Sequence, residues 1–152
     1  MNLQIASRLA IFAVLELAAH PERQLSVAEI GTKYGMSSHH LAKVMNALGR
    51  AKLVRSVRGA GGGFQFSGNA RRTTLLDVIA LFENLGPGGA QSDDPGNGTT
   101  EGAVLGRILT EIEDSARATF GSITLATMLK LMERQQRAGR RSAARGQDRR
   151  IA

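Results

Sequence analysis

The sequence contains no cysteine and no tryptophan, and aromatic residues account for only 4% of its 152 residues. Without cysteine the chain can form no disulfide, no zinc–thiolate site and no cysteine-held iron–sulfur cluster, and it has no cysteine nucleophile. A chain without disulfides fits the reducing cytoplasm, where we expect this protein. Because hydrophobic residues still make up 42% of the chain, the core must be aliphatic, which favours packed helices over a β-sandwich.

A secretory signal and a catalytic motif are also lacking. The apolar N-terminal stretch MNLQIASRLAIFAVLELAAH carries Arg8 and Glu16 and has neither a basic n-region nor a cleavage site. We therefore expect no signal peptide and no membrane span. No serine motif appears, and the loop acids Asp93 and Asp94 are explained most simply as solvated groups. We expect a protein that is not an enzyme.

Charge is distributed unevenly along the chain, whose formal net charge is +7. Residues 1–72 hold ten Lys or Arg and three Asp or Glu, residues 73–133 hold three and nine, and residues 134–152 hold seven and one. This pattern indicates separate working parts. A basic segment attracts nucleic acid or an anionic membrane surface. The basic tail has scarcely any apolar residue, so it is not an amphipathic membrane anchor.

The first fifty residues predict three helices. Apolar residues recur at three- and four-residue steps over 3–20, and on more than one side, so we expect this helix to be buried. Ser26 and Glu29 have the spacing of a capping box that starts a second helix, and Gly35 can end it. Ser37 caps a third helix. The inner face of the third helix consists of Leu41, Val44, Met45 and Leu48. Two short helices joined by a tight glycine-containing turn form the helix-turn-helix pattern.

The glycine-rich run GAGGG, residues 59–63, lies between LVRSV and GFQFS, which alternate like short strands. A dinucleotide cradle would need glycine at the sixth position from Gly59 and a helix after it, but Phe64 stands there and a strand follows. No Lys-Ser or Lys-Thr pair follows either, which excludes a Walker loop. A hairpin is favoured instead, and a basic hairpin directly after a helix-turn-helix is a wing. Arg55 and Arg58 lie on or just before its turn; the alternative is a plain hairpin with solvated arginines.

The third helix and its start carry side chains that suit base edges and phosphates. These candidate DNA contacts are Ser37, Ser38, His39, Lys43, Asn46 and Arg50, and the wing adds Arg55, Arg58 and Gly59. His39 and His40 are adjacent, but they diverge along the helix and no third ligand suggests itself. We therefore expect no metal site.

The second half of the chain predicts a helix over TTLLDVIALFENL (73–85), capped by Thr74 with Asp77 three positions later, then a loop over 86–100 and a long helix from about 101 to 120. The long helix has more apolar surface than the domain can cover, so it packs on the first helix, forms a dimer interface, or does both. The apolar residues concerned are Val104, Leu105, Ile108, Leu109, Ile112, Ala116 and Phe120. A short last helix ends near Glu133, and we expect the basic tail after it to be disordered.

The order of these elements, from Met1 to about Met132, resembles the Rrf (type two) family of bacterial winged-helix transcriptional regulators, which includes IscR, NsrR and CymR. Its most specific pieces are LVRSVRGAGGGFQFSG, TLLDVI and ITLATML. The family pattern L-V-x-S-x-R-G-x-x-G-G-[YF] is matched here by Leu53, Val54, Ser56, Arg58, Gly59, Gly62, Gly63 and Phe64. The resemblance implies a homodimeric DNA-binding repressor whose long helix forms the dimer.

Many members of that family sense through an iron–sulfur cluster held by three cysteines in the loop before the long helix, and some add an acidic ligand from the first helix. Here the loop, 86–100, has no cysteine, and the matching part of the first helix has Arg8. The chain thus resembles the cysteine-free members, and we expect no cofactor and an effector or protein partner of another kind. The resemblance places the minor-groove contact of the wing on Arg58. It places the contacts of the reading helix on Ser37, Ser38, His39 and Lys43.

We therefore expect a mainly α protein with four parts: a winged helix-turn-helix domain with a small β-hairpin wing (1–84), a flexible loop (85–100), a long C-terminal dimerisation helix with a short final helix (101–133) and the basic tail (134–152). The main hypothesis is a dimeric repressor on a pseudo-palindromic site of double-stranded DNA, associated with the nucleoid when bound. Helix 37–51 would read the major groove and the 55–65 wing would hold the flanking DNA. The alternative is a protein–protein interaction module without sequence-specific DNA reading, which docks a partner through its acidic 73–133 region.

Overall fold

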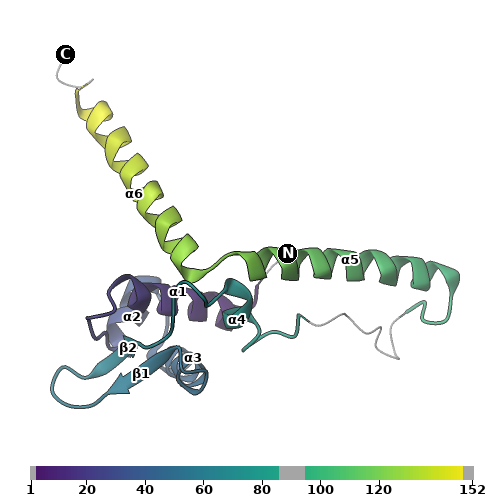
Figure 1. The fold of residues 1–152 in the computed structure, drawn as a ribbon, viewed down its shortest axis with the longest axis horizontal. Helices are drawn as coiled ribbons and strands as arrows, with labels where there is room; N and C mark the ends of the chain where they lie inside the picture. The colour runs from purple at the N-terminus through teal and green to yellow at the C-terminus, as the bar shows by residue number, and fades with distance from the viewer. Residues whose placement is uncertain (1–2, 86–94, 149–152) are drawn as a thin grey trace.

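The computed structural model describes residues 3–85 and 95–148. The elements in this part of the chain are α1 (Ile5–Ala19), α2 (Val27–Tyr34), α3 (Ser38–Arg50), β1 (Val54–Val57), β2 (Gly63–Phe66), α4 (Leu75–Ile79), α5 (Thr100–Ser122) and α6 (Leu125–Asp148) (Figure 1). The mainly helical fold with a two-stranded hairpin confirms the expected fold class. Most of the predicted loop, including Asp93 and Asp94, lies outside the described residues. So do residues 149–152 of the basic tail.

Helix α1 lies at the centre of the core. It packs against α3, α4, α6 and β2, and nine of its fifteen residues are buried. This confirms the predicted helix that is apolar on several sides. The core is aliphatic, as expected, because none of the aromatic side chains among the described residues is fully buried. The largest fully buried side chains include Leu17, Leu41, Met45, Leu48, Ile79 and Leu125.

The predicted caps fix the ends of α2 and the start of α3. The Ser26 hydroxyl accepts a hydrogen bond from the Glu29 amide at 3.1 Å, and the Glu29 carboxylate accepts one from the Ser26 amide at 2.7 Å. Gly35 ends α2 with a φ of +65°, and Ser37 caps α3 through the His40 amide. Both helices therefore begin and end as their local sequence dictates.

Helix α4 and the junction between α5 and α6 are held together by the main chain. Thr74 and Asp77 form the predicted capping box, but α4 is shorter than expected and ends at Ile79. Segment 70–75 pairs with segment 123–126 through three main-chain hydrogen bonds of 2.8, 2.9 and 2.8 Å. The start of α6 is thus fastened beside the start of α4, and the side chain of Leu125 is fully buried there.

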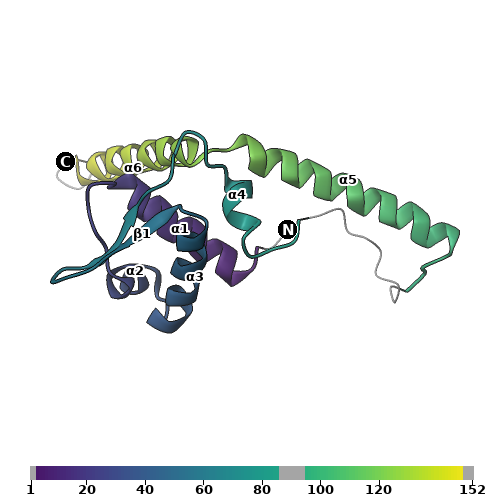
Figure 2. The ribbon, with the colours of Figure 1, turned by 60° about the horizontal axis from the view of Figure 1, so that its bottom comes forward.

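Helix α5 extends from the body on one side and α6 on another (Figures 1 and 2). None of the residues of α5 is buried. Where it meets the body it packs mainly against α4, rather than against the first helix as one alternative expected. Phe120 at its C-terminal end is half-buried against the core.

The C-terminal region differs from the prediction. We expect a short helix to 133 and a disordered tail, whereas α6 continues as one helix to Asp148. The apolar periodicity does end at Met132, but the following segment is rich in Arg, Gln and Ala, which are good helix formers. Extending an existing helix also avoids the cost of nucleation. No helix in the described parts of the chain is long and apolar enough to cross a membrane.

Candidate nucleic-acid interface

The glycine-rich run forms the tip of a hairpin. Strands β1 and β2 pair antiparallel, and Val57 opposite Gly63 is the last pair before the turn. Gly59 and Gly61 have φ values of +114° and +76°, in the region that side chains rarely adopt. The Gly62 amide donates to the Gly59 carbonyl at 2.9 Å and closes the turn. The predicted hairpin is confirmed, and these glycines are required by its backbone angles.

The hairpin is fixed to the body by a third extended segment. The Leu25 amide donates to the Phe64 carbonyl at 3.0 Å, and the Phe64 amide donates to the Leu25 carbonyl at 2.8 Å. A Cβ atom on Gly63 would lie 2.5 Å from the Leu25 carbonyl oxygen. Only glycine lets these two backbones approach so closely. The sequence predicts the hairpin, but this attachment, which sets the direction of the wing, appears only in the fold.

The two wing arginines have different surroundings. Both are exposed, but the Arg55 guanidinium donates to the Gln65 side-chain oxygen at 3.2 and 2.7 Å. The Gln65 amide in turn donates to the Pro21 carbonyl at 2.7 Å. Arg58, at the base of the turn, makes no hydrogen bond or ion pair with any residue that the structure describes. Arg55 is therefore held in place by the protein, whereas Arg58 presents its charge to solvent. The strand register, which places Arg55 opposite Gln65, is the signal that could have distinguished Arg55 from Arg58.

Helix α3 turns its apolar side inward and its polar side outward. Leu41, Val44, Met45 and Leu48 are buried, as predicted. The hairpin lies beside α3, which contacts β1 (Figure 1). The predicted contacts on α3 and at its start are all exposed, namely Ser37, Ser38, His39, Lys43, Asn46 and Arg50. The structure therefore gathers the outer side of α3 and the wing on one end of the body.

At the start of α3, Ser37 serves the fold, whereas Ser38 is available for an outside contact. The Ser37 hydroxyl lies 2.9 Å from His40 Nδ1 and also caps the helix, so it is occupied within the protein. Ser38 has no such partner among the described residues. The rings of His39 and His40 meet edge to face, 6.1 Å apart. No group of three His, Cys, Asp or Glu in residues 3–85 and 95–148 is placed to hold a metal ion.

Lys52 is a further exposed cation, between α3 and β1, that the sequence pattern does not single out. It follows α3 with a φ of +59°, and its amide donates to the Gly49 carbonyl at 2.9 Å. The Leu53 amide donates to the Leu48 carbonyl at 3.0 Å. This pair of bonds is a Schellman motif, in which the left-handed position is usually glycine. Lys52 takes that position here, is exposed and lies two residues before β1. The motif could not be predicted from the sequence because the glycine that usually marks it is absent.

A polar cluster between α1 and α2 positions the helix-turn-helix. Lys33 and the Tyr34 hydroxyl both donate to the Glu16 carboxylate, and the Tyr34 ring stacks on Phe12 with centroids 5.1 Å apart. Partial burial alone would raise the pKa of Glu16, but these two hydrogen bonds and the charge of Lys33 together lower that pKa below its usual value. Burial, with the neighbouring Glu16, raises the pKa of Tyr34 to about 12. At neutral pH the cluster is therefore a charged Glu16 with two donors.

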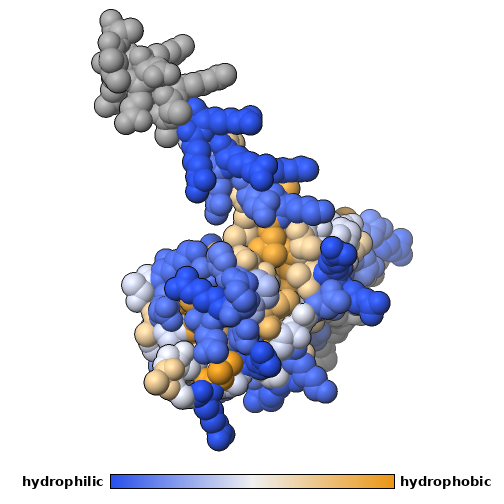
Figure 3. All heavy atoms as spheres, turned by 60° about the vertical axis from the view of Figure 1, so that its left-hand side comes forward, coloured by the Kyte–Doolittle hydropathy of each residue, from blue (hydrophilic) through white to orange (hydrophobic). Residues whose placement is uncertain are grey.

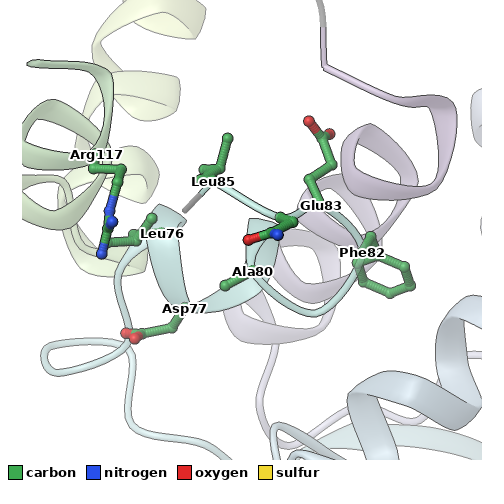
Figure 4. A pocket seen from close by; sticks show the side chains of 8 residues that line it. Leu76, Asp77, Ala80, Phe82, Glu83, Leu85 and Arg117 are labelled. Carbon is green, nitrogen blue, oxygen red and sulfur yellow. The ribbon is translucent and has the colours of Figure 1, made fainter. Parts of the chain in front are cut away.

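An open pocket of about 660 Å³ lies between α4, the turn after it and α5 (Figure 4). It is lined by Leu76, Asp77, Ala80, Phe82, Glu83, Asn84, Leu85 and Arg117. Both carboxylates already accept main-chain hydrogen bonds, Asp77 in the cap of α4 and Glu83 from the Gln4 amide at 2.8 Å. They serve the fold, and the described residues that line the pocket form no arrangement typical of acid–base catalysis.

Comparison with known proteins places this arrangement among regulators. Residues 3–131 match the family model described as Rrf2, iron-dependent transcriptional regulator. The chain is 45% identical over 139 residues to BadM of Rhodopseudomonas palustris, a protein named as an HTH-type transcriptional regulator, covering 90% of this chain and 86% of BadM.

Solved structures agree with that match. IscR of T. potens is similar with a TM-score of 0.72 and 28% identity, covering 90% of this chain and 91% of that one. CymR (YrzC), the global cysteine regulator of B. subtilis, has a TM-score of 0.69 and 25% identity, covering 86% and 98% of the two chains. These likenesses extend over the hairpin, α3 and the long helix alike, rather than over one motif.

Proposed function

The chain belongs to the Rrf2 family of transcriptional regulators, and we propose that it acts as a homodimeric repressor that does not sense through an iron–sulfur cluster. It is a DNA-binding winged-helix regulator, and members of this family are regulators rather than enzymes. The observation that carries the proposed mode of binding is the exposed polar side of α3 beside the solvent-facing Arg58. A regulator of chromosomal DNA works in the cytoplasm, associated with the nucleoid when bound.

In the proposed complex α3 enters the major groove and the wing holds the flanking minor groove or backbone. Lys43 and Arg50 supply charge for phosphates, and Ser38, His39 and Asn46 offer groups for base edges. Arg55 stiffens the wing through Gln65 while Arg58 makes the outer contact. Repression follows when the site overlaps a promoter, because a dimer that spans two half-sites blocks access to the DNA.

Substitution of Arg58 and Lys43 tests this mode. Arg58→Ala should weaken binding to a duplex selected by enrichment of bound DNA, and should leave the oligomeric state unchanged. Lys43→Ala, as a phosphate contact, should weaken binding evenly across sequences and reduce the slope of log affinity against log salt by about one. Arg107→Gln, which removes one positive charge from α5, is the matched control. Equal affinity for selected and random duplexes would instead favour the protein–protein module.

The proposed dimer rests on the apolar side of α5. Its 23 residues span about 34 Å, and between half and 57% of the surface of its large apolar side chains is exposed. These side chains are Val104, Leu105, Ile108, Leu109 and Ile112. A row of this kind is unfavourable in water and is typical of a helix that packs against a second copy.

Sedimentation of two charge-matched variants tests the dimer. Ile108→Glu and Arg107→Gln each lower the net charge by one, but Arg107 lies on the other side of α5. Ile108→Glu should dissociate the dimer at micromolar concentration, because a carboxylate in an apolar interface must be desolvated. Arg107→Gln should remain dimeric. A dimeric Ile108→Glu protein would remove this row from the interface.

The residues present do not fit an iron–sulfur cluster, although the family description names iron. The whole sequence lacks cysteine, and thiolates hold such clusters. Reconstitution of the purified protein with iron and sulfide under anaerobic conditions should therefore leave no bound iron and no visible absorbance, and should not change DNA affinity. Stoichiometric iron with visible absorbance bands would overturn this part of the proposal.

A further inference from the structure

The part of α6 beyond the body carries a row of cations. Lys130, Arg134, Arg137 and Arg141 follow one another at steps of four, three and four residues. At about 100° per residue these positions fall within about 60° on one side of the helix. All four side chains are exposed, and none of them forms an ion pair within residues 3–85 and 95–148. We call these four residues the basic stripe.

The described residues around the basic stripe offer it no partner. Residues 130–141 contain five Lys or Arg and one acid, Glu133. No large apolar residue follows Met132 in this stretch, and every residue from 133 to 141 is exposed. Hydrophilic side chains cover this part of α6, whereas hydrophobic ones gather where it joins the body (Figure 3). The helix therefore extends into solvent without an apolar side to bury.

The direction of α6 separates the basic stripe from the DNA-reading surface. In Figure 1 the helix leaves the body on the side away from α3 and the β1–β2 hairpin. In Figure 2 it extends to the left, as the tip of the hairpin does, but along the top of the body, with the hairpin and α3 below it. Its start cannot swing freely, because segment 123–126 is bonded to segment 70–75 through the main chain. We therefore expect a duplex held by the outer side of α3 and the wing to lie below the body in these views, apart from the basic stripe.

The chemistry of the basic stripe selects its partner. An amphipathic membrane helix needs a broad apolar face, which this segment lacks. Hot spots of tight protein interfaces are enriched in Trp, Tyr and Arg in well-packed, desolvated centres, and beyond residue 132 the described helix offers arginines but no aromatic or large apolar side chain to build such a centre. A phosphate backbone, by contrast, is bound by well-spaced cations alone. Four cations over about 16 Å of helix cover about five nucleotides of one strand.

We propose that the basic stripe binds the phosphate backbone of a second DNA segment while α3 and the wing hold the first. One regulator then bridges two stretches of DNA without reading the sequence of the second. The proposal rests on the DNA binding of the family and does not depend on repression or on the choice of signal.

A capture experiment with the full chain tests this bridging. An immobilised duplex obtained by enrichment is saturated with protein, excess protein is washed away, and a labelled duplex of random sequence is added. The wild type should retain the second duplex at low salt and release it as salt rises. The variant Arg134→Ala, Arg137→Ala, Arg141→Ala should not retain it, although alanine keeps the helix. The corresponding triple lysine variant should retain it, and Gln135→Ala with Gln136→Ala should behave like the wild type.

A salt titration of free protein with random duplex keeps the test independent of operator reading. Loss of three phosphate contacts per chain should lower the slope of log affinity against log salt by about 2.7. An unchanged slope in the triple alanine variant would overturn the proposal. A second pair of results would also overturn it: the triple alanine variant binds the immobilised duplex more weakly than the wild type, and the wild type captures no second duplex. The stripe would then contact the same DNA as α3. If Arg58→Ala does not weaken specific binding, that outcome concerns the wing alone and does not affect the test of the basic stripe.

Discussion

Replacing Gly63 by alanine is expected to detach the wing from the body. The new Cβ would lie 2.5 Å from the carbonyl oxygen of Leu25, 2.7 Å from its carbonyl carbon and 3.0 Å from the amide nitrogen of Ser26. All three are main-chain atoms, so no side-chain rotation can relieve the overlap. The two backbones must separate, and the hydrogen bonds of 3.0 and 2.8 Å between Leu25 and Phe64 are then lost.

The magnitude follows from those two bonds. Each contributes about 0.5–1.5 kcal/mol to stability, so Gly63→Ala should lower the free energy of unfolding by about 1–3 kcal/mol. The wing would also lose its fixed direction relative to α3. DNA affinity should therefore fall even at temperatures where the variant is fully folded.

Urea unfolding followed by circular dichroism measures the effect, with Gly49→Ala as control. The same methyl group at Gly49, inside α3, would meet only the Val54 carbonyl oxygen at 4.0 Å. That variant should gain about 0.5–1 kcal/mol, because alanine favours a helix over glycine. A Gly63→Ala protein as stable as the wild type would refute the steric reasoning, as would an equal loss in both variants.

Two further predictions concern pH and backbone strain. The pKa of Glu16 is lowered in the folded protein, so its carboxylate stays charged at acidic pH values at which the same group in the unfolded chain is already protonated. Wild-type stability should therefore fall as the pH drops through the ordinary glutamate range. Glu16→Gln should lose stability at neutral pH, and its difference from the wild type should shrink in acid; unfolding curves at about pH 7 and about pH 3.5 measure this, and an unchanged difference contradicts it. Lys52 has a φ of +59°, a conformation that glycine adopts more easily than alanine. Urea unfolding should therefore give the Lys52→Gly variant a free energy of unfolding about 1 kcal/mol higher than that of the Lys52→Ala variant. Equal values for the two variants would show that the left-handed position is unstrained.

Local signals predicted local structure well. The capping boxes at Ser26 and Thr74 were readable because a cap joins residues three positions apart. The hairpin was readable because glycines and alternation occupy one short stretch. The inward side of α3 was predicted from its apolar periodicity. The remaining polar residues, which include the candidate contacts, were then assigned to its outward side.

Contacts between distant segments were not readable. Nothing near Gly63 indicates that Leu25 lies against it, and nothing near Gln65 indicates that its amide reaches the Pro21 carbonyl. About 40 residues of chain, including α2, α3 and β1, separate these partners, so only the assembled fold brings them together. The helical continuation of α6 was missed for a different reason. Its prediction relied on apolar periodicity, whereas helix propensity alone carries the segment past Met132.

The junction of segments 70–75 and 123–126 has an evolutionary consequence. Its three hydrogen bonds join main-chain atoms, which every residue except proline supplies on the donor side. Substitutions in these segments can therefore accumulate without changing the angle at which α5 leaves the body. In a dimer built on α5, that angle sets the distance between the two reading helices. The spacing of half-sites along the DNA is then a property that can outlast wide divergence of the side chains around it.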